Sequence, residues 1–131
     1  MHMLFFESVA AYILGGLVYG AMELVFRGFT HMSMVFTGGA CMLCFHLIYR
    51  SFPGMPLALR SVLASLIITA FEFAVGWLVN IRLGLNVWSY SQHPFNLMGQ
   101  VCLLFSCIWF FMAVPMSAAS RMISRMFQKQ P

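Results

Sequence analysis

The chain has 131 residues, of which 62% are hydrophobic and only 8% are charged, and its formal net charge is +4. Soluble domains carry roughly 25% charged residues, so this composition is typical of a protein whose surroundings are a lipid bilayer. It excludes a soluble nucleotide-binding module, and the net charge gives no reason to expect a nucleic-acid partner.

Four segments are apolar and long enough to cross a bilayer, which takes about 20 helical residues. They cover residues 8–26, 32–49, 61–81 and 97–119. We therefore predict an all-α polytopic fold, a four-transmembrane-helix bundle that makes residues 1–131 a single membrane domain with a basic tail over 120–131. Glu7 precedes the first segment and no small-residue cleavage pattern follows it, so we expect this segment to be retained.

Basic residues indicate how the chain crosses the membrane. With four crossings, both termini and the loop 51–59 share one side, which holds five of the seven basic residues: Arg50, Arg60, Arg121, Arg125 and Lys129. The positive-inside rule then predicts cytoplasmic termini in a multi-pass protein of the cell membrane. The tail suits a helix that lies against anionic headgroups, and we interpret it as a topological anchor in preference to a site of specific lipid recognition.

The first predicted helix carries Glu23 four residues before Arg27, about one turn inside its outer end. This spacing puts both side chains on one face, where an ion pair would neutralise them. Tyr12, Gly16 and Gly20 continue that face, and small residues of this kind let membrane helices approach closely. An interfacial ion pair and a functional site near the outer mouth both remain open for Glu23.

The second predicted helix contains the motif Cys41-Met-Leu-Cys44. A membrane redox enzyme that passes electrons from thiols to quinone is therefore one alternative. We disfavour it because thiolates near mid-membrane are costly and buried cysteine usually fills space. No two histidines stand at ligand spacing on one helix, so we predict no haem, metal or other cofactor and do not favour an enzyme.

The third predicted helix carries a carboxylate, Glu72, in the middle of an uncharged run. A charge at that depth costs about 2.5–3.5 kcal/mol on insertion scales and usually marks a functional site. Residues three or four apart form one polar stripe with it: Ser61, Ser65, Thr69, Gly76 and Asn80. Such stripes ordinarily serve helix packing, but packing does not explain the acid. Glu72 is expected to be protonated, paired with another helix or wetted by a cavity.

The segment from Asn86 to Gly99 is rich in aromatic and polar residues, which is more than a connector needs. Trp88 and Tyr90 would belong to an interfacial aromatic belt in most membrane proteins. Pro94 and Gly99 indicate a fixed turn into the last helix, with Asn96 as its cap. We predict that Trp88, Tyr90, Ser91 and Asn96 form a lid or recognition surface.

These motifs together resemble a known family. They are a glutamate in the first helix before Arg27-Gly28-Phe29, then Thr69-x-x-Glu72-Phe73, then Trp88-x-Tyr90-Ser91-x-x-Pro94-Phe95-Asn96-Leu97-x-Gly99, with Cys102-Leu103 and Trp109 beyond. The pattern is similar to that of the type IV ABC-transporter family, also called CmpB-like, over most of the chain. The resemblance implies a small multi-spanning membrane protein with a permease role. It does not indicate which substrate is transported.

The chain departs from that family pattern at two polar positions. Ser89 stands where the family usually has Asp, and Gln100 stands where it usually has Arg. The loss of an acid and a base close together indicates that the two pair in relatives, and we expect a neutral Ser89–Gln100 pair here. The exchange alters activity if those residues carry it, and leaves it intact if they only hold the loop.

We therefore predict a transport-related, permease-like protein in which Glu72 handles a proton or cation. The predicted substrate- or ion-binding residues are Glu72, Glu23, Arg27, Trp88, Tyr90, Ser91, Asn96 and Gln100. Four short helices enclose little volume, so a substrate path is expected to need a homo-oligomer or a partner membrane subunit, and an ATPase in trans. The main alternative is a non-transporting module, either lipid-binding or a regulatory or assembly subunit.

Overall fold

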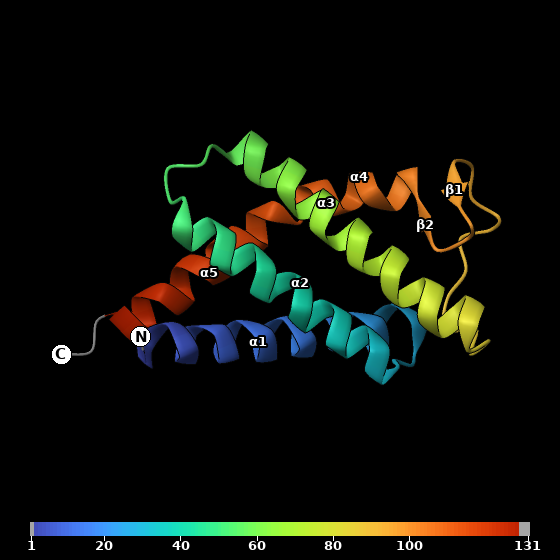
Figure 1. The fold of residues 1–131 in the computed structure, drawn as a ribbon, viewed down its shortest axis with the longest axis horizontal. Helices are drawn as coiled ribbons and strands as arrows, with labels where there is room; N and C mark the ends of the chain where they lie inside the picture. The colour runs from blue at the N-terminus through green and yellow to red at the C-terminus, as the bar shows by residue number, and fades with distance from the viewer. Residues whose placement is uncertain (1, 129–131) are drawn as a thin grey trace.

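The computed structural model describes residues 2–128, and helices make up most of it (Figure 1). The first two helices are α1 (His2–Arg27) and α2 (Met32–Ser51). The next, α3 (Leu57–Gly76), continues into a π-helical segment, η1 (Trp77–Arg82). A small antiparallel hairpin of β1 (Asn96–Leu97) and β2 (Val101–Cys102) then leads into α4 (Leu103–Phe111) and α5 (Ala113–Gln128).

Three helices in the described part of the chain are long and apolar enough to cross a membrane, at residues 3–27, 32–51 and 57–82. They match the first three predicted spans. Helices α4 and α5 pass the same test only as a pair, with a bend of 41° between them. The pair has the form of a broken span or a re-entrant loop.

The prediction of one continuous helix over residues 97–119 is wrong. Its first residues form the hairpin instead, and the backbone takes positive φ at Phe95, Met98 and Gly99, which a helix does not allow. The helix also breaks at Met112, because Pro115 lacks the amide that would donate to the carbonyl of Phe111. Beyond the break, α5 runs through to Gln128, so the tail continues this helix; Lys129 lies outside the described residues.

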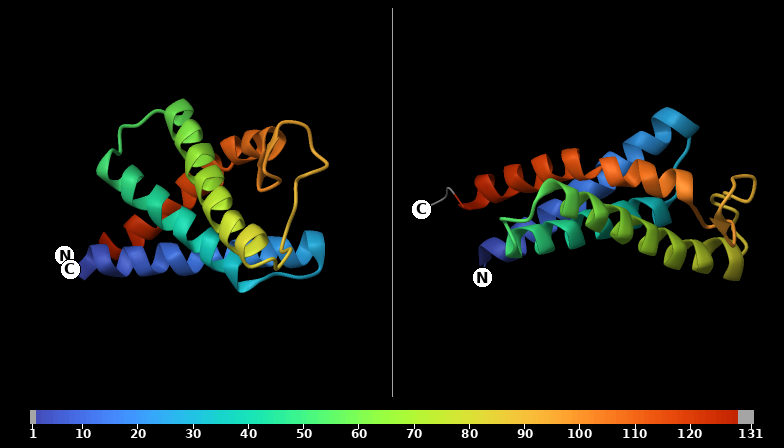
Figure 2. Two further views of the ribbon diagram at one scale, coloured as in Figure 1. Left: turned by 45° about the vertical axis from the view of Figure 1, so that its right-hand side comes forward. Right: turned by 90° about the horizontal axis from the view of Figure 1, so that it is seen from above.

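The connections alternate between the two ends of the bundle (Figures 1 and 2). The start of α1, the end of α5 and the connection 52–56 lie at one end, which we call the terminal end. The connection 28–31 and the long segment 83–102 lie at the other, which we call the loop end. Helices that run in opposite directions in succession produce this alternation.

Helices α1 and α2 pack closely because glycines remove side chains from their interface. A Cβ atom on Gly15 would lie 2.6 Å from the carbonyl oxygen of Gly38, and one on Gly38 would lie 2.5 Å from Cβ of Tyr19. The predicted packing face is confirmed at Gly16 and Gly20, which both face Val35. Small residues give membrane helices this close contact.

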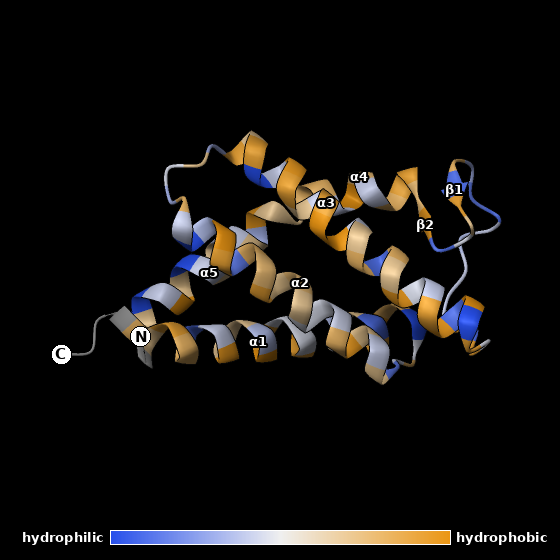
Figure 3. Ribbon diagram, viewed as in Figure 1, coloured by the Kyte–Doolittle hydropathy of each residue, from blue (hydrophilic) through white to orange (hydrophobic). Residues whose placement is uncertain are grey.

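Apolar residues are frequent along the long helices α1, α2 and α3 (Figure 3), and many of the large ones are exposed. Large side chains such as Leu17, Val25, Leu66 and Phe111 are more than half exposed, whereas Phe45 and Ala64 are fully buried inside. A soluble protein rarely exposes so much contiguous apolar surface. The arrangement is that of a bundle whose outer faces contact lipid.

Candidate functional site

Glu72 is buried at the loop end of α3, with 1% of its surface exposed. The indole Nε1 of Trp109 donates a hydrogen bond of 2.8 Å to Oε1, and the hydroxyl of Tyr90 donates one of 2.9 Å to Oε2. Within residues 2–128, no basic side chain forms an ion pair with it. Two neutral donors therefore hold the carboxylate in place without cancelling its charge.

The polar stripe predicted on α3 faces α4, which explains why Glu72 meets Trp109. Ser65 donates a hydrogen bond of 2.8 Å to the carbonyl oxygen of Ser106, and Thr69 shares one of 2.7 Å with the Ser106 hydroxyl. On the same faces of the two helices, Trp109 reaches Glu72. Residues three or four apart share one face of each helix, which places Glu72 on the face of Thr69 and Trp109 on the face of Ser106.

Tyr90 brings the long segment 83–102 into the site. Its ring stacks on Phe105 with centroids 4.8 Å apart, and its amide donates a hydrogen bond of 2.7 Å to the carbonyl oxygen of Gly99. Burial, and next the neighbouring Glu72 carboxylate, raise the pKa of the Tyr90 phenol. The phenol consequently stays protonated and remains a donor to Glu72.

Trp88 and Gln100 form a second buried layer that fixes the loop. Trp88 Nε1 donates a hydrogen bond of 3.0 Å to the carbonyl oxygen of Gln100, and Asn80 Nδ2 donates one of 2.8 Å to Gln100 Oε1. Asn80 Oδ1 accepts from the amide of Val87 at 2.7 Å. Gly76 makes room for this layer, because a Cβ there would lie 2.6 Å from Gln100 Oε1.

Glu23 and Arg27 form an ion pair of 3.1 Å, as their spacing predicted. Arg27 also donates a hydrogen bond of 2.6 Å to the carbonyl oxygen of Val87, which ties the end of α1 to the loop. Of the two carboxylates Glu23 and Glu72, only Glu23 forms an ion pair within residues 2–128.

The remaining predicted loop residues do not join this site. Ser91 and Asn96 are exposed, and Asn96 organises the turn by donating to the carbonyl oxygen of His93 and accepting from the amide of Gly99. The prediction of Asn96 as a helix cap is wrong, because the hairpin delays α4 until Cys102 stands at its cap position.

The expected pairing of Ser89 with Gln100 is also absent from the hydrogen bonds of the described residues. Ser89 donates to Ser91 at 2.9 Å, whereas Gln100 donates to the carbonyl oxygen of Met98 and accepts from Asn80. Both side chains are uncharged, so no electrostatic attraction draws them together, and each is hydrogen-bonded to local partners. With Ser89 and Gln100 at these positions, other contacts hold the loop.

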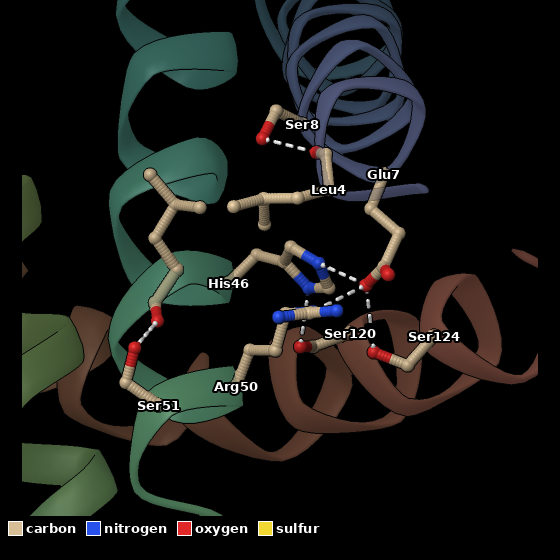
Figure 4. A network of polar contacts seen from close by, with 9 residues as sticks. Leu4, Glu7, Ser8, His46, Arg50, Ser51, Ser120 and Ser124 are labelled. Carbon is tan, nitrogen blue, oxygen red and sulfur yellow. Dashed lines mark hydrogen bonds and ion pairs between the residues drawn. The ribbon is translucent and has the colours of Figure 1, made fainter. Parts of the chain in front are cut away.

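A second buried cluster, at the terminal end, was missed by sequence reasoning (Figure 4). Glu7 and His46 are both fully buried, and His46 Nε2 lies 3.0 Å from Glu7 Oε1. The same oxygen accepts from Arg50 Nε at 3.1 Å and from the hydroxyl of Ser124 at 3.1 Å, while Ser120 lies 2.7 Å from His46 Nδ1. This cluster ties α1, α2 and α5 together.

Faint signals for the second cluster exist in the sequence. His46 and Arg50 are four residues apart, as are Ser120 and Ser124, so each pair shares a helix face. Their common partner, Glu7, is 39 residues from His46 and 117 from Ser124. Local spacing cannot connect positions so far apart.

The four cysteines are unpaired, with Cys41 buried and Cys107 exposed. Cys41 and Cys44 lie on one helix, and neither takes part in the hydrogen bonds around Glu72 described above. The geometry brings no thiol pair into this site.

A bundle of long apolar helices with buried polar side chains at both ends defines the class: a small helical membrane protein. The chain belongs to the family described as "Putative ABC-transporter type IV", whose model matches residues 3–131. The resemblance recognised from the motifs is thereby confirmed. Comparisons with curated proteins and with solved structures find no match.

Proposed function

We propose that this protein is a transport-related, multi-pass component of the cell membrane in which Glu72 binds and releases a proton or cation. We further propose four crossings, with α4 and α5 as one broken span and both termini in the cytoplasm. The single observation that carries the proposal is the environment of Glu72. It is a carboxylate buried within an apolar helix, held by two neutral donors and lacking a fixed counter-charge.

The chemistry follows from that lack of a counter-charge. An ionised carboxylate in a region of low polarity is unfavourable unless a positive charge or a proton neutralises it. Arg27 supplies such a positive charge to Glu23, at 3.1 Å. Glu72 has only Trp109 and Tyr90, which bind either protonation state, so its neutralising partner is free to exchange.

The position of the loop supports the proposal that it acts as a gate at this site. Tyr90 contacts Glu72 directly, and Trp88 closes the layer beside it, whereas Ser91 and Asn96 face outward. We assign Trp88 and Tyr90 to the inner wall of a lid, and Ser91 and Asn96 to its outer recognition surface. Opening the lid would withdraw the Tyr90 hydroxyl and admit the exchanging ion.

The fold supports a larger assembly. Residues 2–128 form only the helices and the hairpin described above, so we propose that a role in an ABC transporter would draw on an ATPase in trans. We propose a homo-oligomer or a partner membrane subunit as the element that completes a substrate path.

Proton uptake by proteoliposomes tests the proposal, with an entrapped pH-sensitive dye as the readout. The protein should carry a pH-dependent proton flux that Glu72→Gln abolishes. Glu23→Gln is the matched control, and should keep a pH-dependent flux because Glu72 remains. Equal flux from Glu72→Gln and the unmodified protein would contradict the proposal.

The alternatives have their own outcomes in the same system. A stable partner that co-purifies, with no flux from the chain alone and none on adding the partner, would indicate a non-transporting regulatory or assembly module. Loss of an activity through Cys41→Ser with Cys44→Ser, but not through Glu72→Gln, would indicate redox chemistry.

A further inference from the structure

Two adjoining hollows run along α5. The first is a cavity of about 320 Å³ between α1, α2, α4 and α5, with Ile68 of α3 also in its wall. Five of its fifteen lining residues are methionines, and the wall has almost no polar surface apart from its aromatic members, Tyr19 and Trp109. The methionines are Met22, Met42, Met112, Met116 and Met122. Flexible, polarisable side chains of this kind adapt to an irregular apolar occupant.

The second hollow has the opposite chemistry. It is a shallow, open depression on the surface of α5 alone, with Arg121 and Arg125 among its five lining residues. The two arginines stand four apart and therefore share a helix face. Met122 lines both hollows, so the basic surface joins the apolar cavity directly.

No acidic side chain of this protein balances these arginines. The chain has three acidic residues in all, and each is engaged elsewhere. Glu7 contacts His46 and Arg50, Glu23 pairs with Arg27, and Glu72 binds Trp109 and Tyr90. Within the described residues, the one hydrogen bond of the Arg121 side chain goes to the hydroxyl of Tyr49, at 3.2 Å.

We propose that these hollows together bind one anionic phospholipid. Arg121 and Arg125 would hold the phosphate, because guanidinium groups match phosphate oxygens with paired hydrogen bonds. One acyl chain would enter the cavity past Met122 and run along α5 toward Trp109. The hollows thus supply a basic site and an apolar site in the order in which a phospholipid presents its headgroup and tail.

The positive charge of Arg121 and Arg125 favours an anionic lipid over a second copy of this chain as the occupant. A second copy would bring the same arginines and no unengaged acidic side chain. The proposed orientation of the bundle also places Arg121 and Arg125 at the cytoplasmic surface, where anionic lipids attract basic residues.

Tryptophan quenching by lipids brominated on an acyl chain tests the site, because Trp109 lines the cavity. The full chain carrying Trp77→Phe, which removes a lipid-exposed indole, is reconstituted in phosphatidylcholine vesicles. Small fractions of brominated phosphatidylglycerol or brominated phosphatidylcholine are then added. The anionic lipid should quench at a mole fraction lower by on the order of tenfold.

Three variants separate the site from general attraction to the surface. Arg121→Gln with Arg125→Gln should remove the anionic preference, and Ala119→Leu, which fills the cavity, should weaken quenching by the anionic lipid. Arg82→Gln, which removes a basic residue at the loop end, should change neither result.

Several results would overturn the proposal. Equal quenching by both lipids in the parent protein would do so without any variant, and so would persistence of the preference after both arginines are removed. Full quenching in Ala119→Leu would place the lipid elsewhere. Absence of quenching by either lipid would mean that something else, such as a second copy, covers the cavity.

Discussion

The hydroxyl group of Tyr90 donates a hydrogen bond of 2.9 Å to Oε2 of Glu72, so a residue outside the helices binds a carboxylate inside them. The two residues are 18 positions apart, and η1 and the start of the loop lie between them. Through this contact, the state of the carboxylate and the position of the loop are linked.

Tyr90→Phe should loosen the loop while the ring keeps its stack on Phe105. The variant removes one hydrogen bond to a group that carries charge, and we expect local opening to become roughly tenfold more frequent. The rate of limited proteolysis between residues 83 and 95 measures this opening. Tyr12→Phe is the control, since the structure shows no hydrogen bond from its hydroxyl within residues 2–128. Equal rates in both variants would contradict the link.

Trp109→Phe should destabilise the bundle by about 1–3 kcal/mol, because Glu72 Oε1 would then be buried without its donor. The loss should appear as a lower unfolding temperature in detergent micelles. Trp77→Phe serves as the matched control: Trp77 is 44% exposed on the outer face of η1, and its replacement should leave the temperature nearly unchanged. A similar shift from both variants would show that the indole of Trp109 acts through size alone.

Gly76→Ala should also destabilise the protein, against the ordinary preference of helices for alanine. The new Cβ would lie 2.6 Å from Gln100 Oε1 and 2.9 Å from Trp88 Cζ2, so the loop layer would have to shift. Overpacking of this kind costs about 1–3 kcal/mol. Gly54→Ala, where nothing lies within 4 Å, should be tolerated in the same unfolding assay. Stabilisation by Gly76→Ala would contradict the packing described for this layer.

Glu7→Ala should separate the ends of three helices. Removing the shared acceptor of His46, Arg50 and Ser124 leaves buried polar groups unpaired, which costs about 3 kcal/mol. Hydrogen exchange of α5 amides should then accelerate. Ser8→Ala is a matched control, because Ser8 donates only within its own helix, to the carbonyl oxygen of Leu4. Unchanged exchange in Glu7→Ala would mean that the cluster does not hold α5.

Sequence spacing predicted the parts of the site that lie within single helices. The stripe from Ser61 to Asn80 and the pair Glu23–Arg27 both follow from residues that stand three or four apart. The first three spans were likewise predicted, because apolar length is a direct property of the sequence. Spacing did not predict which residues on different helices contact one another. Trp109 stood out only as part of the family motif, and its contact with Glu72 required the alignment of α3 with α4.

Hydropathy gave a wrong prediction for the last span, because residues 97–119 form one apolar run in the sequence but not one continuous helix in the structure. The hairpin there depends on positive φ at Phe95 and Met98, which neither residue type favours, and on pairing between Asn96 and Cys102. The kink near Pro115 was foreseeable from the proline alone. The cluster around Glu7 was not, since its members come from three helices far apart in the sequence.

Infrared difference spectroscopy of the reconstituted protein tests most directly whether Glu72 exchanges its neutralising partner. If Glu72 exchanges a proton, a protonated-carboxyl band should rise and fall as pH is cycled, be lost in Glu72→Gln and persist in Glu23→Gln. A Glu72 band that stays constant across the whole pH range would show a permanently neutral, structural acid and would contradict the proposed exchange.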